Sequence, residues 1–398
     1  MSGRLGKGSR LANRLRWRGL VPTSAVAFLA ILLVGTGAAG ACTTSPGQPT
    51  YTVLATIPLV DAIAANSSMV FVQGVTNCSD IWAIVPNGTI SLYATVPVKE
   101  SACDEGALAL APNTTYTGSG LPSNGSGGGH PSVVVNDGAV GAWGRGHCHG
   151  QPTNTTLFDV VSGRLFAITD SGTNVTEIAK FPISHKPSEN MGLAYDQVGS
   201  FGHDLIVTSS SGGNVWLVNA TGNVTLLVKL HTYIGGPAVA PIGFGPFGGD
   251  VIIAEKYLGQ IVAVSPTGNV TNVANWSKAN AVTFPTVGGG HGHGWGEWGG
   301  WGDGGGCTAC SFGSNHDVMF VANYSSGAVE AFPASDLWGY QGDGFVAGGL
   351  NQGIAAFAPN GTTTLFASQT QRLSDIASIY CPTSPPCGGG HGGGGGGW

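Results

Sequence analysis

Two stretches of this chain repeat the same succession of apolar runs and glycine turns. Their second apolar runs, Asp204-Leu-Ile-Val-Thr and Asp250-Val-Ile-Ile-Ala, begin 46 residues apart. Each is followed by a Gly-started apolar run and then by Gly-Asn-Val-Thr, at Gly222 and at Gly268. The next copy begins at Asp317, delayed by the Gly-rich insertion 288–306, and weaker copies begin at Asp80, Gly163 and Gly353.

Each copy contains four short strand patterns separated by turn signals. A period of roughly 40–50 residues with four strands is typical of a β-propeller blade. One four-stranded sheet cannot bury both of its faces, whereas radial stacking of blades hides them. We therefore predict an all-β propeller with six blades, five or seven remaining open. The apolar runs at 51–57 and 375–379 are spare strands that can close the ring.

The remaining segments define the domain boundaries. We assign residues 1–41 to a leader, 42–50 to a linker, 51–380 to the propeller and 381–398 to a Gly-rich tail. Two insertions, 118–155 and 288–306, interrupt the propeller with glycine and histidine. Many of the 68 glycines lie in these insertions and in the tail.

The leader predicts export. Six basic residues end at Arg18, and residues 21–41 are apolar and close on small residues, as in a secretory signal. An uncleaved membrane anchor is the alternative, and Cys42 is a candidate lipidation site. From Cys42 onward nine basic residues face 21 acidic ones, a formal net charge of −12, which disfavours nucleic acid. We expect the protein to be secreted or to lie on the extracellular face of the membrane, with membrane contact only through the leader or a lipid anchor.

Cysteine spacing agrees with an oxidising compartment. The predicted disulfide pairs are Cys78 with Cys103, Cys307 with Cys310, and Cys381 with Cys387. Zinc at Cys307-Thr-Ala-Cys310 would need two more ligands, and no second such pair exists.

Asparagine usage is also unusual, because 13 of the 21 asparagines begin an Asn-X-Ser/Thr triplet. Such triplets accept N-glycans in exported segments. Hairpin turn chemistry explains Asn87, Asn269 and Asn360. It does not explain the others that we predict to be glycosylated, which are Asn66, Asn113, Asn154, Asn275 and Asn323.

Polar residues precede the apolar runs predicted to be innermost strands: Asp61, Glu105, Asn190, Asn280 and Asp375. Segment 190–276 resembles blades of the NHL, virginiamycin-B-lyase-like and gluconolactonase/regucalcin-like propellers. Glu105-Gly-Ala-Leu and Asn190-Met-Gly-Leu-Ala resemble two segments of the gluconolactonase-like enzymes, although the proline after Glu-Gly is missing. This resemblance implies that Glu105, Asn190, Asn280 and Asp375 hold Ca²⁺ or another divalent cation, with Asp375 as the base.

One other interpretation of these polar residues stays open, and the histidines of the insertions form a separate candidate site. Asp and Asn before a strand commonly cap turns, without any ligand. Separately, His147, His149, His291 and His293 in the insertions are candidates for a softer metal.

Two functions follow. The first is an exported, surface-associated propeller that acts as a non-catalytic binding or scaffold protein for an unidentified extracellular ligand or protein. The second is a divalent-metal-dependent lactonase or related hydrolase that uses the central channel. Strong catalytic motifs such as a hydrolase elbow are absent from the sequence, which favours the first.

Overall fold

The computed structural model describes residues 49–74, 77–98, 106–112, 155–183, 190–210, 212–285, 312, 317–349 and 352–379. All structural statements below concern these residues. The leader, residues 118–154 of the first insertion, the whole of the second insertion and the tail lie outside them, so the domain boundaries assigned to those segments stay predictions.

Three antiparallel four-stranded sheets follow one another along the first half of the chain. In each, the strands pair in sequence order from the innermost to the outermost. The first contains β2 (Val60–Ala65), β3 (Val70–Gly74), β4 (Asn77–Ile84) and β5 (Ile90–Thr95). The second contains β6 (Ala107–Pro112), β7 (Thr155–Val161), β8 (Arg164–Thr169) and β9 (Asn174–Lys180). The third contains β10 (Met191–Tyr195), β11 (Leu205–Ser209), β12 (Asn214–Val218) and β13 (Val224–Lys229).

An eight-stranded sheet comes next. It consists of two four-stranded halves that are joined by a single parallel pairing, Gly236 with Ala281. One half contains β14 (Ile234–Val239), β15 (Val251–Glu255), β16 (Gln260–Val264) and β17 (Val270–Asn275). The other contains β18 (Ala279–Thr283), β21 (Gly344–Gly348), β22 (Ile354–Phe357) and β23 (Thr363–Ala367). Each half has the four-stranded layout of the earlier sheets.

The last sheet joins the two ends of the propeller. Its order is β24 (Leu373–Ser378), β19 (Asp317–Asn323), β20 (Ala328–Pro333) and β1 (Thr52–Thr56). The strands predicted to close the ring, at 51–57 and 375–379, therefore do so within one sheet. After β18 the chain builds β19 and β20 here, passes through α1 (Ala334–Leu337), and returns to add β21 to β18. The repeat in the sequence did not predict this exchange between neighbouring sheets.

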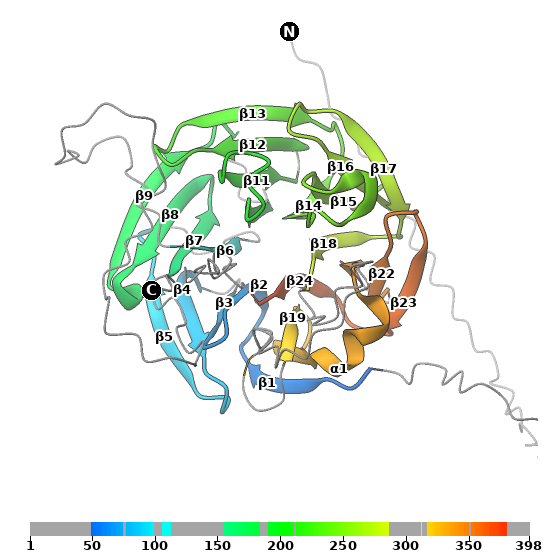
Figure 1. Ribbon diagram of the computed structural model, residues 1–398. Helices are drawn as coiled ribbons and strands as arrows, with labels where there is room; N and C mark the ends of the chain where they lie inside the picture. The colour runs from blue at the N-terminus through cyan, green and yellow to red at the C-terminus, as the bar shows by residue number, and fades with distance from the viewer. Residues whose placement is uncertain are drawn as a thin grey trace, which may run out of the picture. The chain divides into compact units, whose positions relative to one another are not determined.

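The sheets form a propeller. The innermost strands β2, β6, β10, β14, β18 and β24 contact one another in a closed ring, and Figure 1 shows β5, β9, β13, β17, β23 and β1 along the rim. The described strands fall into six four-stranded groups, and the blade number of the whole chain stays a prediction. We call the side on which the innermost strands begin the start face and the opposite side the end face.

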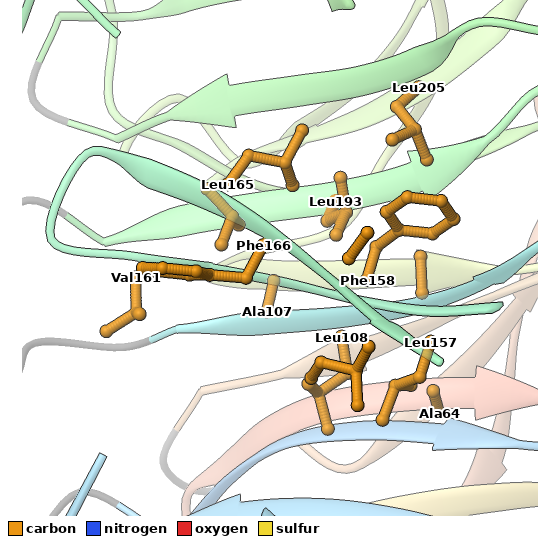
Figure 2. Packing of buried hydrophobic residues seen from close by; sticks show 14 of the residues in the cluster. Ala64, Ala107, Leu108, Leu157, Phe158, Val161, Leu165, Phe166, Leu193 and Leu205 are labelled. Atoms are coloured by element: carbon orange, nitrogen blue, oxygen red, sulfur yellow. The ribbon is translucent and has the colours of Figure 1, made fainter. Parts of the chain in front are cut away.

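Apolar side chains fill the spaces between adjacent sheets. Phe158 of β7 and Phe166 of β8 are fully buried, and Figure 2 shows Phe158 near Leu193 and Leu205 of the neighbouring sheet. Because both faces of each middle strand are covered, β15 has four successive buried apolar residues, 251–254, before Glu255, rather than apolar residues at alternate positions.

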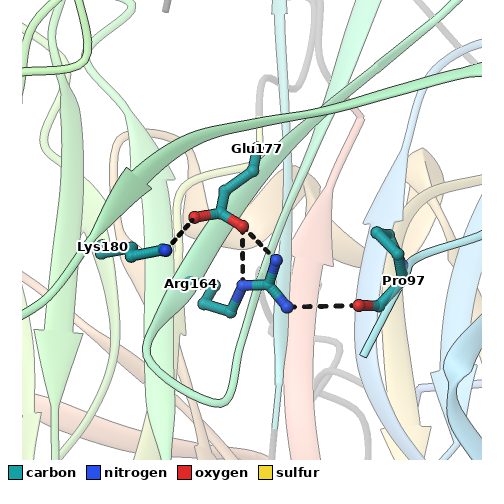
Figure 3. A network of polar contacts seen from close by, with 4 residues as sticks. All are labelled: Pro97, Arg164, Glu177 and Lys180. Carbon is teal, nitrogen blue, oxygen red and sulfur yellow. Dashed lines mark hydrogen bonds and ion pairs between the residues drawn. The ribbon is translucent and has the colours of Figure 1, made fainter. Parts of the chain in front are cut away.

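Polar contacts on the start face also link neighbouring sheets (Figure 3). The Arg164 Nε donates to Glu177 Oε2 at 2.8 Å, and Arg164 Nη1 donates to the carbonyl oxygen of Pro97 at 3.2 Å. Lys180 Nζ lies 3.3 Å from Glu177 Oε1. Burial alone would raise the pKa of Glu177, but hydrogen bonds from Arg164 and Lys180 lower it. Since Pro97 follows β5, this network holds the second sheet against the first.

Candidate ligand-binding channel

A cavity of about 270 Å³ lies at the centre of the ring. All six innermost strands contribute to its wall. Much of the lining is small and apolar, from alanine and glycine. The wall includes Ala64, Ala109, Ala194, Gly236 and Ala281. A cavity of this size admits a small molecule, and polar side chains share the wall with these small residues.

The polar residues that the sequence placed before the innermost strands also line this cavity. Asp61 belongs to β2, Asn190 immediately precedes β10, Asn280 belongs to β18 and Asp375 to β24. The fifth residue of that set, Glu105, lies outside the described residues. Position at the start of an innermost strand was therefore a reliable guide to the cavity, and the role of each side chain depends on its contacts.

Asp375 connects two innermost strands. Its Oδ2 accepts a hydrogen bond from the backbone N–H of Ile63 on β2 at 3.1 Å, and its Oδ1 accepts one from the N–H of Ile376 at 2.9 Å. Burial raises the pKa of Asp375 to about 7, although the two N–H groups act in the opposite direction. Both oxygens of the predicted base thus have protein partners.

Asn280 and Ser374 continue the same seam between sheets. The Asn280 Nδ2 donates to the backbone carbonyl oxygens of Leu373, at 3.4 Å, and Ser374. The Ser374 hydroxyl lies 2.9 Å from the carbonyl oxygen of Val60 and 3.1 Å from that of Ala322. These bonds link β18, β24 and β2, where innermost strands share few backbone hydrogen bonds of their own. Asn280 therefore joins strands, a role that differs from the turn capping expected of such residues.

The start-face mouth of the channel holds a lysine that sequence reasoning missed. Lys256 follows β15, and its Nζ lies 5.4 Å from the centre of the Tyr233 ring, which lines the cavity. Burial lowers the pKa of Lys256, and the negative charge of Asp61 opposes that shift. Lys256 itself does not line the cavity, but Tyr233, which it approaches, and Asp61, whose charge acts on it, both do. The sequence did contain a signal for this lysine. The apolar run of β15 ends in Glu-Lys-Tyr, and charged residues are rare in this chain.

A second missed site lies between the first two sheets. Gln73 Nε2 donates to Asp159 Oδ2 at 3.1 Å and to the carbonyl oxygen of Cys78 at 2.6 Å. Asp159 is fully buried, and burial raises its pKa to about 8 while the bond from Gln73 lowers it. No sequence signal marks this pair, since 86 residues separate its members.

The proposed cation ligands remain untested as a set. Among the described residues, no group of three or more His, Cys, Asp and Glu side chains could hold a metal ion. Asp375 Oδ2 and Asn280 Nδ2 form hydrogen bonds to neighbouring innermost strands. Glu105 lies outside the described residues. The histidines His147, His149, His291 and His293 also lie outside the described residues. The four-residue metal site stays a prediction.

Of the eight cysteines, only Cys78 lies among the described residues, and it is disulfide-bonded. Its predicted pairing with Cys103 stays a prediction, as do the calls on Cys42, Cys307, Cys310, Cys381 and Cys387. In the parts of the chain that the structure describes, no helix has the length and hydropathy needed to cross a bilayer.

One predicted glycosylation site needs correction. Asn323 is only 2 % exposed, and its Nδ2 donates to Glu330 Oε1 at 3.1 Å. The nitrogen that would carry a glycan is thus inside the folded protein. Asn275 is exposed, and Asn66 is half-buried with its Oδ1 accepting from the N–H groups of Ser68 and Met69. Asn113 and Asn154 lie outside the described residues.

No protein-family model matches this chain, and no curated protein matches it. Solved propellers do. A virginiamycin B lyase from Staphylococcus aureus is 12 % identical, with a TM-score of 0.36 over 76 % of this chain and 78 % of that one. A candidate gluconolactonase is 11 % identical, with a TM-score of 0.43 over 83 % and 85 %. An auxiliary nutrient binding protein from Bacteroides thetaiotaomicron is 13 % identical, with a TM-score of 0.41 over 81 % and 64 %. The chain is an all-β propeller that is similar in structure, at low identity, to virginiamycin B lyase and gluconolactonase.

Proposed function

We propose that this protein is an exported, surface-associated propeller that binds a small extracellular ligand without catalysing a reaction on it. The observation that carries the proposal is the central cavity, whose alanines and glycines share the wall with Asp61 and with Tyr233, the ring that Lys256 Nζ approaches to 5.4 Å. The ligand class that fits is a mostly apolar molecule with one anionic or strongly polar group. The apolar part lies among the alanines and glycines, and the polar group lies near Lys256.

The contacts of the polar wall residues support binding over catalysis. Asp375 and Asn280 form hydrogen bonds to neighbouring strands, and these bonds fix the shape of the cavity. A rigid, preformed cavity suits binding, because little conformational entropy is lost when a ligand enters.

A fluorescence titration tests this function. The probe is 8-anilinonaphthalene-1-sulfonate, which joins apolar rings to one sulfonate. We expect saturable binding of one probe per chain, lost in Ala194→Phe, which fills the cavity, and weakened about tenfold in Lys256→Met, the loss of one charged contact. Thr225→Phe, on the exposed face of β13, is the matched control for added bulk. Unchanged binding in Ala194→Phe would refute the channel as the site.

The alternative is a divalent-metal-dependent lactonase or related hydrolase that uses Glu105, Asn190, Asn280 and Asp375. The observation that favours it is Asp375, a carboxyl group on the cavity wall whose pKa burial raises to about 7, near the value suited to a general base. Calorimetric titration with Ca²⁺ separates the two functions. A stoichiometric heat that disappears in Asp375→Asn supports the hydrolase, and its absence supports the binding protein.

A further inference from the structure

Five of the six outermost strands begin at an Asn-X-Thr triplet. Each asparagine lies in or immediately beside the hairpin that joins the third strand of its sheet to the fourth. All five asparagines are exposed. They are Asn87 before β5, Asn174 at the start of β9, Asn223 before β13, Asn269 before β17 and Asn360 before β23.

Four of these hairpins have the same turn. In each, the N–H of a glycine donates to the carbonyl oxygen three residues earlier, at 2.8 to 3.0 Å. The glycine has a positive φ of 79° to 88°, which side chains rarely adopt. The four glycines are Gly88, Gly222, Gly268 and Gly361. The fold therefore requires glycine at this position.

The asparagine takes part in these turns in two different ways. The Oδ1 atoms of Asn87 and Asn360 each accept from the backbone N–H two residues later, whereas the Nδ2 atoms of Asn223 and Asn269 each donate to the hydroxyl of the threonine two residues earlier. Asn87 and Asn360 lie one residue before the turn glycine, whereas Asn223 and Asn269 lie one residue after it. The same glycine turn therefore forms with asparagine on either side of the glycine, so the turn alone does not fix where the asparagine lies. The complete Asn-X-Thr triplet is present in both cases. The triplet is thus what these turns have in common.

The outer strands give a reason for a bulky polar group at this place. An outermost strand has unpaired backbone groups along its free edge, and proteins commonly protect such edges with charged residues. Here β5, β17 and β23 contain no charged residue, and they expose Leu92, Val270 and Leu365 to about half of their full area (52 %, 45 % and 47 %). The usual protection is therefore missing from these edges.

We infer that Asn87, Asn174, Asn223, Asn269 and Asn360 are N-glycosylation sites, which form a ring of glycans around the rim of the end face. At each site the side-chain Nδ2 loses a proton and bonds to the anomeric carbon of a sugar carried by a polyprenyl-phosphate-linked oligosaccharide. The bond from that carbon to the phosphate oxygen breaks, and the phosphate keeps the electron pair. The reaction needs an exported chain, as proposed above.

This arrangement leaves the start face uncovered. Strand directions alternate within each sheet, so a hairpin between the third and fourth strands lies on the end face. The basic side chains of the described residues lie at the other ends of the strands, on the start face. They are Arg164, Lys180, Lys229, Lys256, Lys278 and Arg372. The glycans would therefore stand opposite the channel mouth at which Lys256 lies.

Mass spectrometry of proteolytic peptides from the protein isolated from its own source tests the inference. We expect a sugar mass on each of the five asparagines and none on Asn323, the buried triplet that serves as an internal negative control. Unmodified peptides at all five positions would overturn the inference. Equal occupancy at Asn323 would also overturn it, because exposure in the fold would then not decide the sites.

A pair of variants confirms that the triplet itself is read. Thr89→Ala destroys the triplet at Asn87 and is expected to remove that sugar mass alone. Thr89→Ser keeps the hydroxyl and the triplet, and it is expected to keep the sugar. Because Thr89 is exposed, neither change disturbs the core. Both variants are scored on the secreted full chain in the same host, and loss of the sugar in both or in neither contradicts the assignment. Probe binding in the channel is measured separately, so failure here does not bear on the proposed ligand.

Discussion

The buried carboxyl group of Asp159 predicts that this protein loses stability as the pH rises from acidic to mildly basic. Burial raises the pKa of Asp159 from an ordinary value of 3.8 to about 8. Between these values the folded chain keeps a proton that the unfolded chain releases. Stability falls with pH wherever the folded state binds more protons. Its loss begins near the unfolded value and ends near the folded one.

The size of the effect follows from the shift. One pKa unit corresponds to about 1.4 kcal/mol, so Asp159 alone removes at most about 5 kcal/mol of unfolding free energy between pH 4 and pH 8. Asp159→Asn keeps the shape of the side chain and an oxygen that can accept from Gln73 Nε2, but it cannot ionise. The unfolding free energy of the variant, relative to that of the wild type, is therefore expected to increase steadily as the pH rises.

Urea unfolding measured at pH 5, 6, 7 and 8 checks this expectation. The difference in unfolding free energy between Asp159→Asn and wild type should grow in favour of the variant across the series. Asp80→Asn, at a partly exposed position, is the matched control for replacing a carboxylate by an amide. A difference that stays constant from pH 5 to pH 8 would refute the burial of an ionisable group at this position.

Other positions give shorter tests. Phe158→Ala should cost about 3–5 kcal/mol of unfolding free energy, seen as a lower urea midpoint, whereas Leu226→Ala on the exposed face of β13 should cost under about 0.5 kcal/mol. Ser374→Ala should cost about 1–2 kcal/mol, because it removes the hydroxyl that links β24 to Val60 and Ala322, and an unchanged midpoint would contradict that link. Arg164→Gln should cost about 1 kcal/mol, and the cost should shrink in high salt if the ion pair with Glu177 carries it. β-sheet circular dichroism should persist at pH 3, because buried carboxyl groups with raised pKa values are already protonated there, and cooperative unfolding between pH 5 and pH 3 would contradict this.

The periodic part of the fold could be predicted from the sequence because each sheet repeats a local pattern. The second strands after Asp204, Asp250 and Asp317 lie at equivalent positions, and the strands at both chain ends close the ring as expected. The pairing of β18 with β21 rather than β19 could not be predicted. A repeat identifies strands by their residues, whereas edge pairing after a long insertion depends on which sheet lies nearest in space.

The candidate site divides in the same way. Position at the start of an innermost strand predicted that Asn190, Asn280 and Asp375 line the channel. The contacts that decide their roles come from other sheets. Asn280 and Ser374 are 94 residues apart in the chain, and Ile63 and Asp375 are 312 residues apart. Only the closed ring brings such partners together, so sequence spacing gave no sign of them.

Hydrogen–deuterium exchange with and without 8-anilinonaphthalene-1-sulfonate tests the channel as the ligand site most directly. Peptides that cover the innermost strands β2, β10, β14, β18 and β24 are compared with peptides that cover the outermost strands β5, β13, β17 and β23. We expect slower exchange in the innermost set at saturating probe, and no change in the outermost set. Slower exchange confined to the outermost strands, or none at saturation, would contradict the assignment of the central channel as the binding site.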